Sequence, residues 1–296
     1  MMKYLNLQLF AAEENVTTTT DLEPVISIDF TTRLSENIDG LREVLGITEM
    51  TPMQAGTKIK SYKMTKTNSP SQAAEGDVIA LTKIERKLAW EKDLTLKKYR
   101  KATTAEAIQK IGYDKAVNQT DEKLLSETQK DIKKDFYTAL KTGSGSATGT
   151  NLQTACANLW AKLQERFEDY DVTPVFFINP QDVADYLGTA QITMQTVFGM
   201  SYIQNFLGMG NAIVTTGVDA KAPYATAAEN LCGAYIPVGG DVAKTFSLTM
   251  DQTGLIGMTH YTTGERATFE TLMMSGVLFW PEYADGVFKA TIAPVE

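Results

Sequence analysis

The feature that most constrains this chain is a long alternation of apolar and charged residues between Lys83 and Lys101. Its apolar positions share one parity: Ile84, Leu88, Trp90, Leu94 and Leu96. A period of two predicts a β-strand, and a strand of this length would span about 60 Å, much longer than a usual core strand. Arg86 and Lys92 interrupt the apolar parity, so we expect this strand to be only partly buried.

The alternating segment has a candidate partner upstream, and we expect residues 57–101 to form a long β-hairpin. Thr57 to Thr65 favours a strand, and residues 66–72 have the composition of a turn. An isolated hairpin is only marginally stable in water, so this one must lie on another surface. A neighbouring subunit would provide that surface. The alternative is that the segment divides into two or three shorter strands of an ordinary sheet.

Charge is distributed unevenly along the sequence. Residues 57–115 carry a net charge of +7, whereas residues 1–56 carry −6 and residues 116–296 carry −9. A basic middle segment could bind nucleic acid, or it could bind the acidic surface of another copy of the chain. Few aromatic residues accompany its lysines, and strand packing explains Trp90 better than base stacking does. This disfavours an enzyme or a nucleic-acid-binding protein built on the segment.

The composition excludes several kinds of site. His260 is the only histidine, which rules out metal sites that need two histidines, and we interpret it as a hydrogen-bonded imidazole on or beside a strand. Cys156 and Cys232 lie among apolar neighbours and are typical of packing residues. A metal site that combines these three is the remaining option, although no two of them are close in sequence. We therefore expect no catalytic residues, no metal and no cofactor.

Residues 113–141 predict a long amphipathic helix with one apolar stripe: Val117, Leu124, Ile132, Phe136 and Leu140. We interpret its opposite, charged face as solvated surface: Asp121, Glu122, Lys123, Glu127, Lys130, Lys133 and Lys134. The glycine- and serine-rich segment 142–150 then has the composition of a flexible linker. It is the best internal boundary of the chain.

The remainder of the chain predicts an α+β arrangement. An amphipathic helix at 152–167 precedes a buried strand at 172–178, and Asn179-Pro180 begins a second helix. Further strands are expected at 212–217, 231–238, 266–273 and 287–292. A single helix–strand–helix passage followed mostly by strands does not favour a doubly wound sheet.

At the amino-terminal end, the segment from Glu13 to Thr20 is polar and has no periodicity, so residues 1–30 resemble an arm that orders only against a partner. Asp29 to Leu45 predicts a short amphipathic helix. No apolar run in the sequence approaches the length of a membrane span.

This order of parts resembles the major capsid protein of tailed bacteriophages, which has the Hong Kong 97 fold. The passage Pro174 to Val183 is similar to the strand, Asn-Pro and helix of phage axial domains. Gly276 to Lys289 resembles the family's terminal strand, aromatic-Pro-Glu turn and return strand. Met1 to Phe10 is similar to the openings of capsid proteins from phages of low-GC Gram-positive bacteria.

The resemblance implies an α+β capsid fold with four parts. Residues 1–30 would be the N-terminal arm, and residues 57–101 the long β-hairpin called the E-loop. The peripheral domain would comprise residues 31–56 and 102–149, with its spine helix at 113–141 and C-terminal strands near 262–278. Residues 150–296 would form mainly the axial domain.

It also implies a function. Hexamers and pentamers would assemble into an icosahedral head that encloses double-stranded DNA and contacts it non-specifically, with no membrane. The chain would be made in the cytoplasm of a bacterial host, reside in the virion, and work with a portal protein and a separate scaffolding protein. The alternative is an encapsulin-like nanocompartment shell that encloses a cargo enzyme, although the threonines at 17–20 disfavour the amino-terminal helix of those shells.

Two sets of residues are candidate sites. We expect basic hairpin side chains to dock on the acidic surface of a neighbouring subunit: Lys58, Lys60, Lys63, Lys66, Arg86 and Lys87. We expect Gly143, Gly145 and Gly149 to form a hinge that lets the axial domain swing relative to the long helix.

Overall fold

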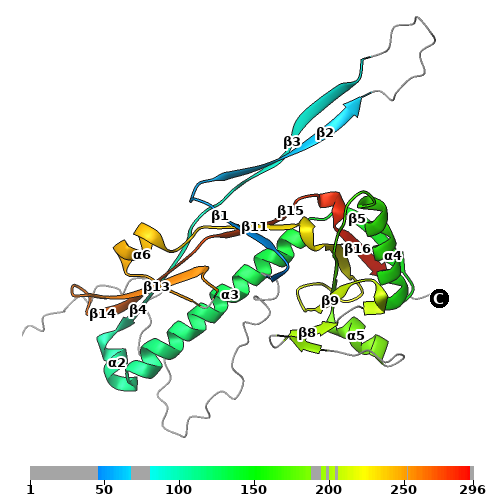
Figure 1. Ribbon diagram of the computed structural model, residues 1–296. Helices are drawn as coiled ribbons and strands as arrows, with labels where there is room; N and C mark the ends of the chain where they lie inside the picture. Colours follow the sequence, from blue (N-terminus) through cyan, green and yellow to red (C-terminus); the bar gives the residue numbers. More distant parts are fainter. Residues whose placement is uncertain are drawn as a thin grey trace, which may run out of the picture.

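The computed structural model describes residues 46–67, 81–187, 195–197, 200–203, 206–251 and 253–293. Helices and mainly antiparallel strands form an elongated body, from which a two-stranded ribbon projects (Figure 1). This mixture confirms the predicted α+β class. The arm predicted at residues 1–30 and the helix predicted at 29–45 lie outside the described residues.

The predicted long helix is confirmed as α3 (Gln119–Leu140), which continues from a π-helical turn, η1 (Asp114–Asn118). A separate short helix, α2 (Ala105–Ile111), precedes the turn and ends at Gly112, whose φ of 95° is easily adopted only by glycine. In the predicted apolar stripe, Ile132, Phe136 and Leu140 of α3 and Val117 of η1 are buried, and Leu124 is half-buried. The stripe packs against β15 (Val277–Pro281), and Phe136 contacts the rings of Phe177 and Phe279 in the main core.

A seven-stranded sheet forms one end of the body. Its strand order is β5 (Gly145–Gly149), β16 (Phe288–Ile292), β10 (Tyr224–Ala227), β6 (Pro174–Ile178), β9 (Asn211–Val214), β8 (Met200–Ile203) and β7 (Gln195–Val197). The predicted helix α4 (Leu152–Arg166) covers β5, β16, β10 and β6 and buries its apolar face in a second core. Asn179 caps α5 (Pro180–Leu187) as predicted, because its side chain accepts the N–H of Gln181 at 2.9 Å.

Two smaller sheets complete the body. The four-stranded antiparallel sheet has the order β12 (Thr249–Met250), β13 (Ile256–Thr263), β14 (Thr268–Ser275) and β4 (Lys97–Thr104), and the three-stranded sheet has the order β1 (Glu49–Pro52), β11 (Leu231–Tyr235) and β15. The strands predicted near 212, 231, 266 and 287 are confirmed as β9, β11, β14 and β16. Short helices lie between strands: α6 (Gly240–Phe246), η2 (Phe206–Gly208), η3 (Ala228–Asn230) and η4 (Ala284–Gly286).

The hairpin is shorter than predicted. It consists of β2 (Lys58–Thr67) and β3 (Lys83–Asp93), which pair antiparallel. Its predicted continuation to Lys101 is wrong, because the chain leaves the ribbon at the fully buried Leu94 and residues from Lys97 onward pair with β14 as β4. The alternation continues across this break because both strands are partly exposed, so periodicity does not reveal the change of partner.

The flexible linker predicted at 142–150 is also wrong, because residues Gly145–Gly149 form β5, paired in parallel with β16. Glycine is needed here for close approach. A Cβ would lie 2.5 Å from Val287 Cβ at Gly143, 2.3 Å from Phe288 Cδ1 at Gly145, and 2.4 Å from the backbone nitrogen of Ala155 at Gly149. The hinge at these glycines stays a prediction, and rotation there requires β5 to separate from β16.

Substitution of Gly149 tests this packing role. Gly149→Ala is expected to destabilise the subunit by about 1–3 kcal/mol, because the crowding atoms are backbone atoms of α4 that cannot rotate away. The control is Gly264→Ala, where a Cβ meets nothing within 4 Å and the change should stay within about 0.5 kcal/mol. Urea unfolding of the two variants should separate them, and equal midpoints would contradict the packing role.

Candidate assembly surface

The base of the hairpin is anchored to the body by a small core. Leu94 is fully buried beside Ala234 and Ile236, with Ile59 and Trp280 packed against the cluster. The rings of Trp90 and Trp280 meet edge to face with centroids 6.1 Å apart. Leu94 also exchanges backbone hydrogen bonds with the two residues before β2: its carbonyl accepts the N–H of Gly56 at 2.9 Å, and its N–H donates to the carbonyl of Thr57 at 3.0 Å. These contacts fix the direction in which the ribbon leaves the body.

A β-bulge at Ala89 reverses the two faces of the ribbon. Ser61 pairs with Trp90, but the next residue, Tyr62, pairs with Leu88, so Ala89 has no partner on β2. Side chains that pair across a ladder share a face, and successive residues point to opposite faces. Trp90 and Leu88 therefore lie on opposite faces, although their equal parity in the sequence predicts one face. Bulges of this kind re-aim side chains.

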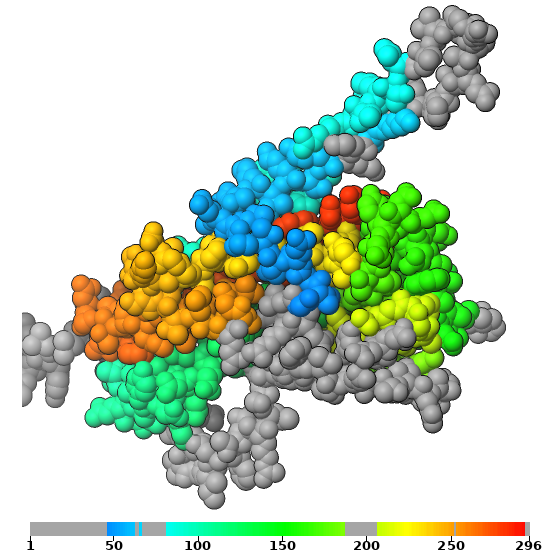
Figure 2. Space-filling model, in the orientation of Figure 1, coloured from blue at the N-terminus to red at the C-terminus, as the bar shows by residue number. Residues whose placement is uncertain are grey.

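Beyond the bulge, one face of the ribbon combines apolar and basic side chains, which we call the distal face: Tyr62, Lys66, Ile84, Arg86 and Leu88. Tyr62, Ile84 and Leu88 are 42%, 68% and 50% exposed. The Arg86 guanidinium lies 3.6 Å from the centre of the Tyr62 ring. Figure 2 shows the described part of the hairpin, in blue and cyan, standing clear of the body. The distal face therefore carries apolar side chains that the described part of the subunit leaves exposed.

The six basic residues predicted as contacts differ in their surroundings: some pair with acids of their own hairpin, and others are exposed on the distal face. Lys58 and Lys60 pair with Glu91 on their own hairpin, at 2.8 and 3.3 Å, and Lys87 pairs with Glu85 at 3.1 Å on the face opposite the distal face. Lys66 and Arg86 are exposed on the distal face, and the side chain of Lys63 lies outside the described residues. Between the bulge and the strand ends, both faces of the ribbon together carry five basic residues and one acidic residue: Lys63, Lys66, Lys83, Glu85, Arg86 and Lys87. The excess positive charge of the hairpin therefore lies in its outer part, beyond the bulge.

Solved structures similar to this one identify the fold. The SrpI encapsulin complex from Synechococcus elongatus PCC 7942 matches with a TM-score of 0.59 at 11% identity, over 86% of this chain and 88% of that one. The capsid of an empty GTA particle matches with a TM-score of 0.59 at 9% identity, over 90% and 94% of the chains. Mycobacterium phage Patience matches with a TM-score of 0.56 at 9% identity, over 96% and 94%.

The chain has the Hong Kong 97 fold. This confirms the fold that the sequence resemblance implies. By sequence alone, no protein-family model and no curated protein matches the chain. Structural similarity therefore extends over nearly the whole chain at identities of about one residue in ten, so it establishes the fold only.

A buried polar cluster holds this Hong Kong 97 fold together at the start of the long helix. The carboxylate of Asp121 lies 2.5 Å from Lys101 Nζ on β4 and 2.8 Å from His260 Nε2 on β13, and it accepts the hydroxyl of Thr271 on β14 at 2.8 Å. Lys101 also donates to the carbonyl of Val117. The side chain of Asp121 is only 6% exposed, so its placement on a solvated face is wrong.

A second ion pair lies on the same sheet. Arg100 holds the Glu270 carboxylate with two hydrogen bonds of 2.8 and 2.9 Å, and Thr263 donates to the same group. The hydrogen bonds from Arg100 lower the pKa of Glu270 to about 2. Because this folded-state pKa is below the unfolded value, the stabilisation is fully present above about pH 4.3 and is lost as the pH falls toward 2.

Glu270→Gln should expose this linkage. The variant is expected to lose roughly 1–3 kcal/mol at pH 7, a range reduced by the partial exposure of Arg100, and to depend less on pH between 5 and 2. Urea unfolding across that pH range measures both effects. Glu265→Gln, at an exposed position of the neighbouring turn, is the control. An unchanged pH slope for Glu270→Gln would contradict the assignment.

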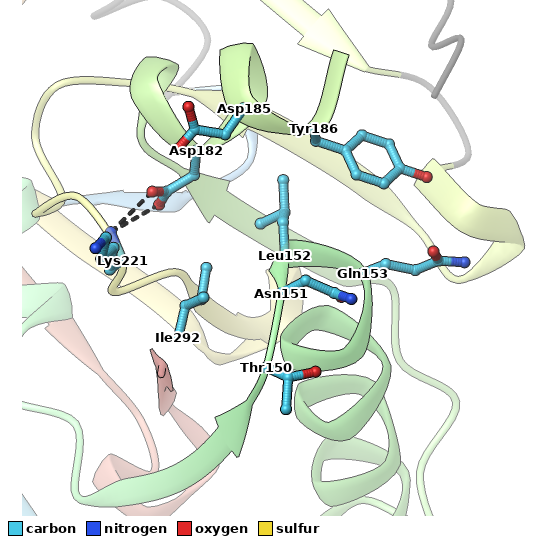
Figure 3. A pocket seen from close by; sticks show the side chains of 9 residues that line it. All are labelled: Thr150, Asn151, Leu152, Gln153, Asp182, Asp185, Tyr186, Lys221 and Ile292. Atoms are coloured by element: carbon cyan, nitrogen blue, oxygen red, sulfur yellow. Dashed lines mark hydrogen bonds between the residues drawn. The ribbon is translucent and has the colours of Figure 1, made fainter. Parts of the chain in front are cut away.

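A pocket of about 540 Å³ lies between the first turn of α4 and α5 (Figure 3). Asp182 and Asp185 line it from α5, Gln153 lines it from α4, and Asn151 lines it from the position just before α4. Both oxygens of Asp182 accept the backbone N–H of Lys221, at 2.8 and 3.0 Å, and burial raises the pKa of this carboxyl. Asp182 thus joins α5 to the segment before β10, which is a structural use of a buried acid.

The candidate metal ligands lie in different elements: Cys156 in α4, Cys232 in β11 and His260 in β13. Burial raises the pKa of the Cys156 thiol to about 12 and that of Cys232 to about 11, so neither is a thiolate near neutral pH. Within the part of the chain that the structure describes, no three metal-binding side chains gather. Among the described helices, none combines the length and apolar character that a membrane span requires.

Proposed function

We propose that this chain is the major capsid protein of a tailed bacteriophage, a structural protein that forms hexamers and pentamers in the icosahedral head around double-stranded DNA. The observation that carries the proposal is the projecting ribbon, whose distal face leaves Tyr62, Ile84 and Leu88 exposed. A lone two-stranded ribbon is marginal in water, and exposed apolar surface of this kind marks a contact. The fold supports the same function, because phage capsid structures share it.

The mechanism of such a shell is geometric. Each ribbon reaches from its anchored base onto the next copy, so every subunit both gives and receives the same contact. Head-to-tail contacts of this type form a closed ring when the rotations between successive copies add up to a full turn. Obligate interfaces often exceed about 2,000 Å², and a ribbon of about 33 Å adds contact area well outside the body.

We propose no catalytic role. In the described residues, the sole histidine is bonded to Asp121, and both cysteines keep their protons. Of the two acids that line the pocket, Asp182 is bonded to backbone. The proposed partners are further copies of the chain, a portal protein, a separate scaffolding protein and packaged DNA held non-specifically. The proposed location is the virion, after synthesis in the cytoplasm of a bacterial host.

An encapsulin-like nanocompartment is the second candidate. It is favoured by the match to the SrpI encapsulin complex, which covers 88% of that chain. The two candidates differ in content, because a phage head encloses DNA and a nanocompartment encloses a cargo enzyme.

Expression of the chain, alone and with its neighbouring genes, tests the proposal. Electron microscopy should show closed particles, and particles from infected or induced cells should contain nuclease-protected double-stranded DNA. Particles that hold a co-purifying enzyme and no DNA would favour the nanocompartment. Monomers under every condition would reject both.

A further inference from the structure

The end of α4 and the turn after β15 form an exposed surface of opposite character to the distal face. We call it the acidic–tyrosine patch, and it comprises Glu168, Asp169, Tyr170, Asp171, Glu282 and Tyr283, all of which are exposed. Tyr170 is 60% exposed and Tyr283 is 39% exposed. A solvated acidic surface needs no aromatic rings, so the two exposed tyrosines among the carboxylates indicate a contact surface.

Contacts beneath the patch hold its tyrosines in place. The ring of the buried Phe167 meets those of Tyr170 and Tyr283 edge to face, with centroids 6.2 and 6.5 Å apart. Arg166 lies 5.0 Å from the centre of the Tyr283 ring and pairs with Asp285 at 3.2 Å. The patch is therefore pre-organised, which reduces the entropy lost when a partner binds.

We propose that the acidic–tyrosine patch receives the distal face of the hairpin of a second copy of this chain. The inference rests on the proposed function, since it names the surface that the ribbon contacts. The two surfaces are complementary in charge: Lys66 and Arg86 on one oppose the carboxylates of the other. They also match in apolar character, because Ile84 and Leu88 would cover the rings of Tyr170 and Tyr283.

The placement of the two surfaces suits a ring of identical subunits. In Figure 1, the ribbon rises from the upper edge of the body, and the turn that follows β15 lies along the same edge. Rotation about an axis perpendicular to a shell leaves the same edge of every subunit facing the same side of the shell. A ribbon can therefore lie over the patch of the next copy without inversion, and each copy offers one ribbon and one patch.

Arg86 is well suited to the contact. Its guanidinium stacks on Tyr62, which leaves the edges of the guanidinium directed away from the ring for carboxylates of a partner. In this contact, Tyr62 lies on one side of the Arg86 guanidinium and its carboxylate partners, and the patch tyrosines lie on the other side. Displacement of water from these apolar neighbours strengthens the ion pairs that form between copies.

Charge exchange between the surfaces tests the proposal. Lys66→Glu with Arg86→Glu, and separately Asp169→Lys with Asp171→Lys, should each lower the yield of particles at least tenfold while leaving circular dichroism of the subunit unchanged. The chain that combines all four changes should regain particles. Asp241→Lys with Glu265→Lys makes the same charge change at exposed positions elsewhere and should assemble normally.

The outcomes separate this contact from the shell function. If the unmodified chain forms particles and the patch reversal does so equally well, the contact is wrong and the shell function stands. Failure of the combined chain to regain particles also overturns the contact. If the unmodified chain never forms particles, the proposed function is rejected, and the contact falls with it.

Zero-length cross-linking gives a second, independent test. Particles assembled from a mixture of ¹⁴N- and ¹⁵N-labelled chains are treated with a carbodiimide, which joins an amine to a carboxylate that touches it. Mass spectrometry should find Lys66 joined to Asp169 or Asp171, with the two peptides carrying different labels. The proposal would be overturned if Lys66 were joined only to carboxylates outside the patch. It would also be overturned if the two joined peptides always carried the same label, which indicates a link within one chain.

Discussion

Replacing Asp121 with alanine is expected to destabilise the folded subunit by about 3–5 kcal/mol, the range for a buried ion pair that loses one partner. The substitution leaves the ammonium of Lys101, whose side chain is 12% exposed, without its carboxylate. It also removes the acceptor of His260 and of Thr271, so β4, β13 and β14 lose their shared connection to α3. Urea unfolding of unassembled subunits measures the loss.

Glu122→Ala is the matched control for this variant. Glu122 is the neighbouring exposed acid in the same first turn of α3, so both changes remove one favourable interaction with the helix dipole. Glu122→Ala should lower stability by no more than about 1 kcal/mol. Adding Lys101→Met to Asp121→Ala should recover part of the loss, since no buried charge then stays unpaired. Equal stability of the two single variants would contradict the importance of the cluster.

Excision of the outer hairpin is expected to abolish particle formation while leaving a folded subunit. Ser61 and Trp90 are directly opposed across the ladder, so a two-residue Asn-Gly turn can join them in place of residues 62–89. The design keeps Leu94 in its core and Trp90 on Trp280. It removes the distal face and the contact area on which we expect assembly to depend. Particle yield by sedimentation should fall at least a hundredfold.

The fold of the shortened subunit is checked separately from assembly. Its unfolding midpoint should stay close to that of the unmodified subunit, because the described part of the excised segment, residues 62–67 and 81–89, projects from the body (Figure 2). Particles at normal yield from a chain without its outer hairpin would show that assembly uses other surfaces.

Sequence reasoning located most of the helices and strands because their patterns are local. The stripe from Val117 to Leu140 has the period of a helix, and α3 follows it. Asn179-Pro180 has the chemistry of a helix start, and α5 begins there. The order of these local elements was also enough to indicate the Hong Kong 97 fold, which the similar structures confirm.

The errors arise where the deciding contact is distant in sequence. Asp121 lies among charged residues on its helix, and only the approach of Lys101 and His260 shows that it is buried. The bulge at Ala89 depends on the pairing of β3 with β2, so equal parity placed Leu88 and Trp90 on one face. The composition of 142–150 is that of a linker, and only the packing against β16 reveals a strand.

The way in which the hairpin joins the body has a mechanical consequence. After β3, the chain passes through Leu94 directly into β4, which pairs with β14 in eight successive positions from Ser275↔Lys97 to Thr268↔Thr104. Hydrogen bonds of an antiparallel ladder run perpendicular to its strands. A pull on the ribbon along β4 therefore loads these bonds in shear, all at once, so the tension spreads over the whole ladder. The ribbon is thus tethered along the whole length of β4, and an outward pull on it is resisted by the four-stranded sheet to which β4 belongs.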